Sequence, residues 1–148
     1  PWLAIADIDR FKNINDTHGH LFGDEILLLI ARLLRDCFRF DDLLFRYGGE
    51  EFIIILNNTD ANGAELALER FRSTIDNYRF PTVGHVTTSI GWVGVREKEA
   101  ASTIIHRADQ ALYRAKALGR NQLVNFEEAF AGEEPPESAA RLELFQDR

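Results

Sequence analysis

The chain has little or none of several residue types that stabilise or target a protein by special means. Its 148 residues include no methionine, one cysteine and four prolines, and no apolar run approaches the roughly 18 residues that span a bilayer. A single cysteine excludes an internal disulfide, and no basic segment followed by an apolar stretch opens the chain. These absences exclude a membrane span and a secretory signal within this sequence, and they predict one domain held by its hydrophobic core.

The first residues indicate a piece of a longer polypeptide. No methionine is present, and Pro1 leads directly into an apolar stretch that is typical of a core strand. We therefore expect an upstream regulatory domain in the full-length protein.

Acidic residues are unevenly distributed along the chain. The formal net charge is -7, and residues 127–148 hold seven acidic residues and two arginines, which leaves only -2 for residues 1–126. An acidic chain is a poor partner for a nucleic-acid polymer. We predict a folded domain over residues 1–126 and a flexible acidic tail over 127–148. Leu142, Leu144 and Phe145 would form a short docking helix if that tail is ordered.

Hydrophobic periodicity predicts alternating strands and helices after Pro1. Strands are expected at 2–8, 43–47, 52–56, 83–95 and 122–126. Helices are expected at 24–38, from the N-cap Asp60 to Tyr78, and from Ser102 or Thr103 to Gly119. The polar residues 9–23 are expected to form a loop.

The two middle strands predict a hairpin. Gly48 and Gly49 lie between them and would supply the positive φ angles of a tight antiparallel turn. The order βαββαβαβ with such a hairpin favours an α+β fold, a ferredoxin-like sandwich in which helices flank a mainly antiparallel central sheet.

Carboxylates stand at the ends of the predicted central strands. Asp7 and Asp9 end the first strand, and Glu50 and Glu51 lie in the hairpin turn. If these strands are neighbours, at least three carboxylates converge, and they repel one another unless a cation binds. Hard oxygen ligands select Mg²⁺ or Mn²⁺, the metals of phosphoryl transfer. Each motif taken alone also fits an ordinary solvated loop or turn.

Polar and basic residues suited to a nucleotide follow these acids. Lys12 could place a cation beside phosphate oxygens, and an amide at Asn15 with a carboxylate at Asp24 could hydrogen-bond a guanine base. Lys116 and Arg120 are four residues apart and could reach one face of the last helix. The alternatives are that Asn15 and Asp24 cap a turn and a helix, and that the two bases complement a helix dipole.

Four blocks of residues, in this order, are similar to the GGDEF domain of bacterial diguanylate cyclases over about residues 3–126. They are Asp7-Ile-Asp-Arg-Phe-Lys-x-x-Asn-Asp-x-x-Gly-His-x-x-Gly-Asp24, Arg46-Tyr-Gly-Gly-Glu-Glu-Phe52, Ser89-Ile-Gly91 and Ala108-Asp-x-Ala-Leu-Tyr-x-Ala-Lys-x-x-Gly-Arg-Asn121. Glu50 replaces the aspartate of the family signature, a GGEEF variant that is usual among active members. The helix and the Asp-x-Leu-Thr-Gly-Leu-x-Asn-Arg segment that normally precede the first strand of the family are not in this sequence.

The resemblance implies a nucleotidyl-cyclase-type fold and a diguanylate cyclase. Such an enzyme condenses two GTP into cyclic di-GMP and two pyrophosphates across a two-fold homodimer, with Mg²⁺ or possible Mn²⁺, on the cytoplasmic side of the membrane. By position, Asp7, the carbonyl of Ile8 and Glu50 would bind the metal. Glu50 would also be the base for the attacking 3′-hydroxyl, and Glu51 would support it.

The remaining matched positions would hold the substrate. The resemblance assigns to Lys12 a catalytic role, in which it stabilises charge on the phosphates in the transition state, and it has Lys116 and Arg120 also hold the triphosphate. It assigns guanine recognition to Asn15 and Asp24, and a place in the same nucleotide-binding segment to His20. The alternative function is a catalytically silent module that binds GTP or cyclic di-GMP. A third hypothesis is a cyclase that uses a nucleotide other than GTP, but Asp24 is the residue expected for guanine and argues against it.

A regulatory motif also matches the family. Arg39 and Asp42 occupy the Arg-x-x-Asp inhibitory site at which cyclic di-GMP binds, and product feedback is implied. Arg70 or Arg72 on the following helix could complete this site, and sequence spacing does not decide between them. The alternative is a plain surface ion pair.

Overall fold

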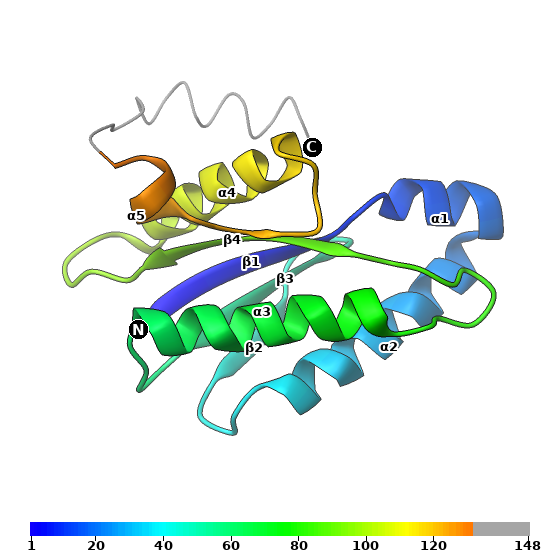
Figure 1. The fold of residues 1–148 in the computed structure, drawn as a ribbon, viewed down its shortest axis with the longest axis horizontal. Helices are drawn as coiled ribbons and strands as arrows, with labels where there is room; N and C mark the ends of the chain where they lie inside the picture. The colour runs from blue at the N-terminus through cyan, green and yellow to red at the C-terminus, as the bar shows by residue number, and fades with distance from the viewer. Residues whose placement is uncertain (132–148) are drawn as a thin grey trace.

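In the computed structural model, which describes residues 1–131, a five-stranded sheet lies between two layers of helices (Figure 1). The elements follow the order β1 (Trp2–Ile8), α1 (Phe11–His18), α2 (His20–Cys37), β2 (Leu43–Arg46), β3 (Glu51–Leu56), α3 (Ala61–Asn77), β4 (Thr88–Gly94), α4 (Ala101–Ala117), β5 (Leu123–Asn125) and α5 (Phe126–Ala129). The tail segment with Leu142, Leu144 and Phe145 lies outside the described residues. No helix within residues 1–131 is both long and apolar enough to cross a bilayer.

The strand order of the sheet is β2-β3-β1-β4-β5. β1 is central and runs antiparallel to both β3 and β4, and among the strands of residues 1–131 only β4 and β5 pair in parallel. The predicted hairpin of β2 and β3 is confirmed, with Leu43 opposite Ile55. Its turn uses a positive φ of 79° at Gly48, whereas Gly49 does not have the positive φ that was expected. The predicted α+β class with a mainly antiparallel sheet is therefore confirmed.

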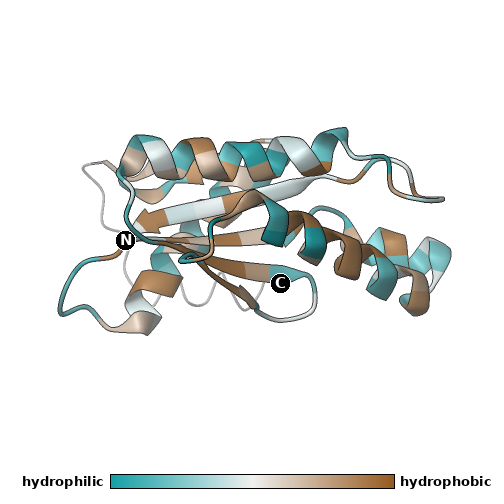
Figure 2. Cartoon of the chain, turned by 90° about the horizontal axis from the view of Figure 1, so that it is seen from below, coloured by the Kyte–Doolittle hydropathy of each residue, from teal (hydrophilic) through white to brown (hydrophobic). Residues whose placement is uncertain are grey.

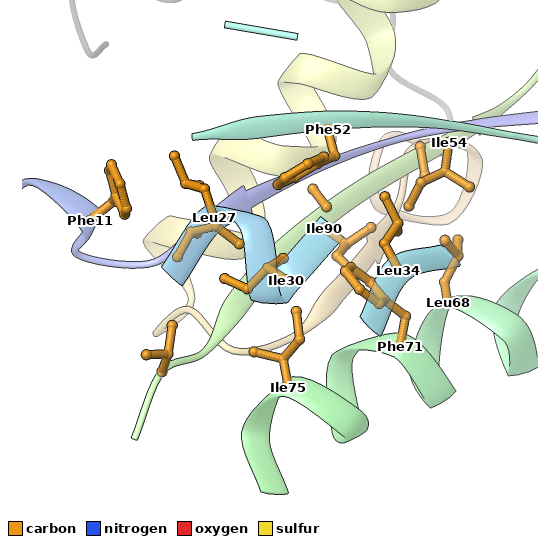
Figure 3. Packing of buried hydrophobic residues seen from close by; sticks show 14 of the residues in the cluster. Phe11, Leu27, Ile30, Leu34, Phe52, Ile54, Leu68, Phe71, Ile75 and Ile90 are labelled. Carbon is orange, nitrogen blue, oxygen red and sulfur yellow. The ribbon is translucent and has the colours of Figure 1, made fainter. Parts of the chain in front are cut away.

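The larger core lies where α2 and α3 cover one face of the sheet. Ile30 of α2, Phe71 and Ile75 of α3, and Ile90 of β4 are fully buried and point toward one another (Figure 3). Hydrophilic and hydrophobic stretches alternate along the helices that flank the sheet, as amphipathic helices require (Figure 2). Asp60 caps α3 as predicted, because its Oδ1 accepts a 2.8 Å hydrogen bond from the amide of Gly63.

On the opposite face, α4 lies directly against β1 and β4. A Cβ atom built on Gly91 would come within 2.1 Å of the backbone nitrogen of Leu112 and 2.3 Å of the carbonyl oxygen of Ala108. Ala108, Ala111 and Ala115 are fully buried at this contact. Small residues on both sides thus let the helix approach the sheet closely, and the approach fixes where the C-terminal end of α4 lies.

The prediction of a loop over residues 9–23 is wrong. Residues 11–18 form α1, and α2 begins at His20 rather than Asp24. Phe11 and Ile14, three residues apart, bury one face of α1 in the core shared with α2, and Gly19, with a φ of 91°, separates the two helices. Asp24 therefore lies inside α2, and the alternative that it caps this helix is also wrong.

Other boundaries also differ from the sequence predictions, most of them by one or two residues. β4 is shorter than the expected 83–95, because the chain turns at 80–84, where Phe80 pairs with Gly84. α4 begins at Ala101, so neither expected cap residue is its N-cap. The last strand ends at Asn125, whose side chain caps α5 by accepting from the amide of Glu128.

Candidate active site

The predicted acidic residues lie where β1 ends beside the β2–β3 turn. Asp7 is directly opposite Glu51 in the antiparallel register, and the two are only 4% and 8% exposed. The amide of Ile8 donates a 3.1 Å hydrogen bond to the carbonyl of Glu50, which ties the turn to the end of the central strand. The fold thus brings Asp7, Ile8, Glu50 and Glu51 together, although Glu50 comes 43 positions after Asp7 in the sequence.

A lysine from the other end of the sequence joins these acids. Lys116, in the last turn of α4, places its Nζ 3.1 Å from Oδ2 of Asp7. The lysine side chain is 27% exposed and the aspartate side chain 6%. A buried carboxylate needs such a partner, because an uncompensated charge in the interior is strongly destabilising. The close packing of α4 on Gly91 therefore places a cation at the acidic site.

Contrary to the expectation from the sequence, Asp9 does not join the acidic site. Its carboxylate accepts hydrogen bonds from Oγ of Ser89 at 2.6 Å, Oγ1 of Thr87 at 2.7 Å and the amide of Asn121 at 3.1 Å. Within residues 1–131, no three acidic, histidine or cysteine side chains lie together in a group that could hold a metal ion. Asp9 therefore adds no carboxylate to the site of Asp7, Glu50 and Glu51, because its own carboxylate joins the end of β1 to β4 and to the turn after α4.

The residues predicted to recognise guanine lie on α1 and α2. Asn15 of α1 packs against Gly23 of α2 so closely that a Cβ built on Gly23 would lie 1.9 Å from Oδ1 of Asn15. That amide oxygen is buried without a hydrogen-bond partner among residues 1–131, which is costly unless a ligand supplies a donor. Asp24, the next residue of α2, is exposed, and so is His20 at its first position. Sequence reasoning missed the role of Gly23 in leaving room for Asn15.

The predicted phosphate-binding residues come from two regions. Lys12 is exposed on the first turn of α1, directly after the acidic strand end. Arg120 lies in the turn after α4 and has a positive φ of 66°. This turn is tied back to the strand end by the hydrogen bond from the amide of Asn121 to Asp9.

A network of charged groups on α3 lies behind that turn. Arg72 forms two hydrogen bonds with Glu69, at 2.6 and 2.8 Å, and donates at 2.7 Å to the side-chain oxygen of Asn121. The Glu69 contact raises the pKa of Arg72, and the Arg72 guanidinium lowers the pKa of Glu69. The pKa of Asp76 is lowered first by its hydrogen bond from His85 and then by one from Asn121.

The predicted inhibitory residues line a separate cavity of about 200 Å³. The backbone amide of Arg39 donates to the carboxylate of Asp42 at 3.0 Å, so the two form one tight turn. Arg70 lines the same cavity and donates to the carbonyl of Cys37 at 2.7 Å. Arg72 instead turns toward Asn121. The structure thus distinguishes the two arginines that sequence spacing left open.

Comparison with known proteins agrees with this arrangement. The model of the diguanylate cyclase GGDEF domain family matches residues 2–122. The chain is 44% identical over 125 residues to diguanylate cyclase A of Treponema denticola, which covers 82% of this chain and 34% of that protein. It is also 44% identical over 124 residues to diguanylate cyclase DgcP of Pseudomonas aeruginosa, covering 82% of this chain and 18% of that protein. The chain thus spans 34% and 18% of the length of these two relatives.

Solved structures share the same fold. The GGDEF domain of DgcB from Caulobacter crescentus in complex with c-di-GMP superposes with a TM-score of 0.81 at 32% identity, covering 85% of this chain and 77% of that one. The active GGEEF domain of a diguanylate cyclase from Vibrio cholerae has a TM-score of 0.78 at 35% identity, with coverages of 84% and 81%. Fold and site together define an α+β nucleotide-cyclase-type domain. The chain belongs to the GGDEF domain family of diguanylate cyclases, a family that uses a divalent metal.

Proposed function

We propose that this domain is the catalytic half-site of a diguanylate cyclase, which condenses two GTP into cyclic di-GMP and two pyrophosphates. The observation that carries the proposal is the meeting of Asp7, Glu51 and Lys116 at the turn that holds Glu50. Buried acids beside a basic residue are suited to positioning a metal-bound nucleotide. Membership of the family supports the same reaction.

The donors at the strand end fit Mg²⁺. Asp7, the carbonyl of Ile8 and Glu50 would hold it, and such a set of two carboxylates and one carbonyl is typical of sites that substrate phosphates complete. Oxygen ligands would accept Mn²⁺ as well. When bound, the metal would neutralise the charge that develops on the phosphate under attack.

The residues of the chain then position the groups that react. Glu50 accepts the proton of the 3′-hydroxyl as this oxygen forms a bond to the α-phosphorus of the other nucleotide, and the bond from that phosphorus to pyrophosphate breaks. Glu51 supports Glu50 and Asp7. Lys12, Lys116 and Arg120 bind the triphosphate and stabilise its charge. No protein nucleophile is needed, because positioning and charge neutralisation suffice for in-line attack.

Base recognition is assigned to α1 and α2. The buried oxygen of Asn15 can accept from a guanine N–H, and Asp24 can accept from the paired N–H donors that adenine lacks. His20 borders the same nucleotide-binding segment. This arrangement favours GTP over ATP.

Catalysis requires a homodimer. Each 3′-hydroxyl attacks the nucleotide held by the partner, so two domains face each other about a two-fold axis. One domain alone holds half of the reacting groups. An upstream regulatory domain in the full-length protein would control this encounter.

Product detection tests the proposed activity. The chain, joined to a dimerising coiled coil, is incubated with GTP and Mg²⁺, and cyclic di-GMP is measured by mass spectrometry. We expect product from the wild type and none from Glu50→Gln, while Glu65→Gln, at an exposed position on α3, keeps the wild-type rate. GTP binding without product from the wild type would instead favour the silent binding module.

We further propose product feedback at the cavity lined by Arg39, Asp42 and Arg70. Arginines bind phosphates and guanine edges bidentately, and Asp42 can accept guanine N–H groups. The placement of Arg70 beside the motif supports this site. Arg39→Ala is expected to relieve inhibition by added cyclic di-GMP, whereas Arg35→Ala on the exposed face of α2 leaves it unchanged. Unaltered inhibition in Arg39→Ala would reduce the motif to a surface contact.

A further inference from the structure

The turn between α4 and β5 is held in an unusual backbone conformation. Gly119, Arg120 and Asn121 have consecutive positive φ angles of 124°, 66° and 49°. Glycine adopts such angles freely and asparagine more readily than most residues, but the left-handed region costs roughly 1–2 kcal/mol for a residue such as Arg120. Contacts from outside the turn therefore help to hold it.

Those contacts come from two elements that are remote in sequence. The amide of Asn121 donates to Asp9, which follows β1 and is itself only 6% exposed. The side-chain oxygen of Asn121 accepts from Arg72 of α3 at 2.7 Å. Local bonds add to these, since the amide of Arg120 donates to Ala115 and its carbonyl accepts from Gln122.

Both external partners are themselves fixed. Asp9 accepts from Thr87, just before β4, and from Ser89 within β4, so its carboxylate cannot follow the turn if the turn moves. The side chain of Arg72 is 16% exposed and is held by Glu69, while its Nη1 donates to Asn121 at 2.7 Å and also contacts Asp76 at 3.4 Å. The position of Arg120 is therefore set through its neighbour by the end of β1 on one side and by α3 on the other.

We propose that Asn121 and Arg72 are positioning residues that present Arg120 to the triphosphate, although neither would touch the nucleotide. The inference rests on the proposed function, because it takes Arg120 as a phosphate ligand. None of the substrate-binding residues assigned above lies on α3. The proposed role of Arg72 means that α3 nevertheless affects the affinity for the nucleotide. Disruption of the Arg72–Asn121 contact lets the left-handed turn relax and withdraws one cation from the phosphates.

A comparison of GTP binding with GMP binding distinguishes this positioning role from a general loss of stability. Affinities of the chain for GTP and for GMP are measured by calorimetry with Mg²⁺, since their ratio reports contacts to the outer two phosphates. For Asn121→Gly we expect the GTP affinity to fall roughly tenfold, in line with loss of a charge-assisted contact, and the GMP affinity to stay constant. Glycine keeps the positive φ accessible, so this variant retains its fold.

A double-mutant cycle tests whether the two residues act together. Arg72→Ala should lower the GTP-to-GMP affinity ratio to a similar extent, and the double variant should be no worse than either single one. Arg79→Ala, at an exposed position after α3, is the matched arginine control and should keep the wild-type ratio. Steady-state assays should show a raised KM for GTP with little change in kcat.

The outcomes are distinguishable from those for the proposed function. An unchanged GTP-to-GMP ratio in Asn121→Gly overturns the positioning role, and so do fully additive effects in the cycle. A wild-type chain that binds GTP in preference to GMP but forms no cyclic di-GMP contradicts the cyclase proposal alone, and the ratio still decides the positioning role.

Discussion

Gly91→Ala should both destabilise the domain and disturb the acidic site, because the Gly91 backbone is in contact with α4. The added methyl group would lie 2.1 Å from the backbone nitrogen of Leu112. Ordinary van der Waals separations are about 3.5 Å, so α4 must withdraw by more than about 1 Å. A helix backbone cannot rotate out of the way as a flexible side chain can.

The magnitude follows from that displacement. Overpacking of a well-packed core costs typically 1–3 kcal/mol, and contact with backbone atoms places this change near the upper limit. Unfolding of a domain of this size should then shift down by about 10 °C. Movement of α4 also carries Lys116 away from Asp7, now 3.1 Å from it, and a misplacement of about 1 Å can lower a rate about 100-fold.

Thermal unfolding followed by circular dichroism measures the stability, and the cyclic di-GMP assay measures the rate. Gly94→Ala on the same strand is the matched control: its methyl group would meet side chains rather than backbone, the Trp2 ring at 3.3 Å and Oε1 of Glu127 at 3.9 Å, and these can shift. We expect a loss under about 1 kcal/mol for that control. A Gly91→Ala protein that unfolds within about 2 °C of the wild type would refute the argument from close packing.

Three further predictions concern other contacts. Gly23→Ala would place a methyl group 1.9 Å from the amide oxygen of Asn15 and should raise the KM for GTP, measured with the fold checked by circular dichroism. Asp60→Ala removes a helix cap and should lower the free energy of unfolding by about 1 kcal/mol in urea titration. The hydrogen bond from His85 lowers the pKa of Asp76. The contribution of ionised Asp76 to stability is therefore fully present above 3.8, the ordinary pKa of an aspartate, and it is lost as the pH falls through the lowered pKa. Urea titrations at pH 7 and pH 3 should show this loss in the wild type and a smaller one in His85→Ala.

The strands and the hairpin could be predicted because their signals are local. Alternating or continuous apolar residues and a Gly-Gly turn specify β1 to β3, and the position of two acidic motifs at their ends follows once these strands are neighbours. α1 could not be recognised in the same way. Only Phe11 and Ile14 of its eight residues are buried, so its apolar face is too short to stand out from a polar loop.

The roles of Asp9 and of the two arginines depend on tertiary structure. Residues two apart in a strand point to the same face, which would place Asp7 and Asp9 together if the strand included both. β1 ends at Ile8, so this rule does not apply to Asp9. Arg70 and Arg72, two residues apart on a helix, point about 200° apart, which predicts that only one faces the cavity. Which of them does so depends on how α3 rotates to bury Phe71.

The ion pair of Lys116 and Asp7 means that the domain does not need a nucleotide to complete its fold. The lysine acts as a resident counter-ion for a carboxylate that would otherwise be unpaired in the interior. In the proposed cyclase, a metal-bound triphosphate would replace Lys116 as the positive partner of Asp7, and the ammonium group would move to the phosphates. Binding would then redistribute charge that the folded domain already holds, because Asp7 has a counter-ion before the nucleotide arrives.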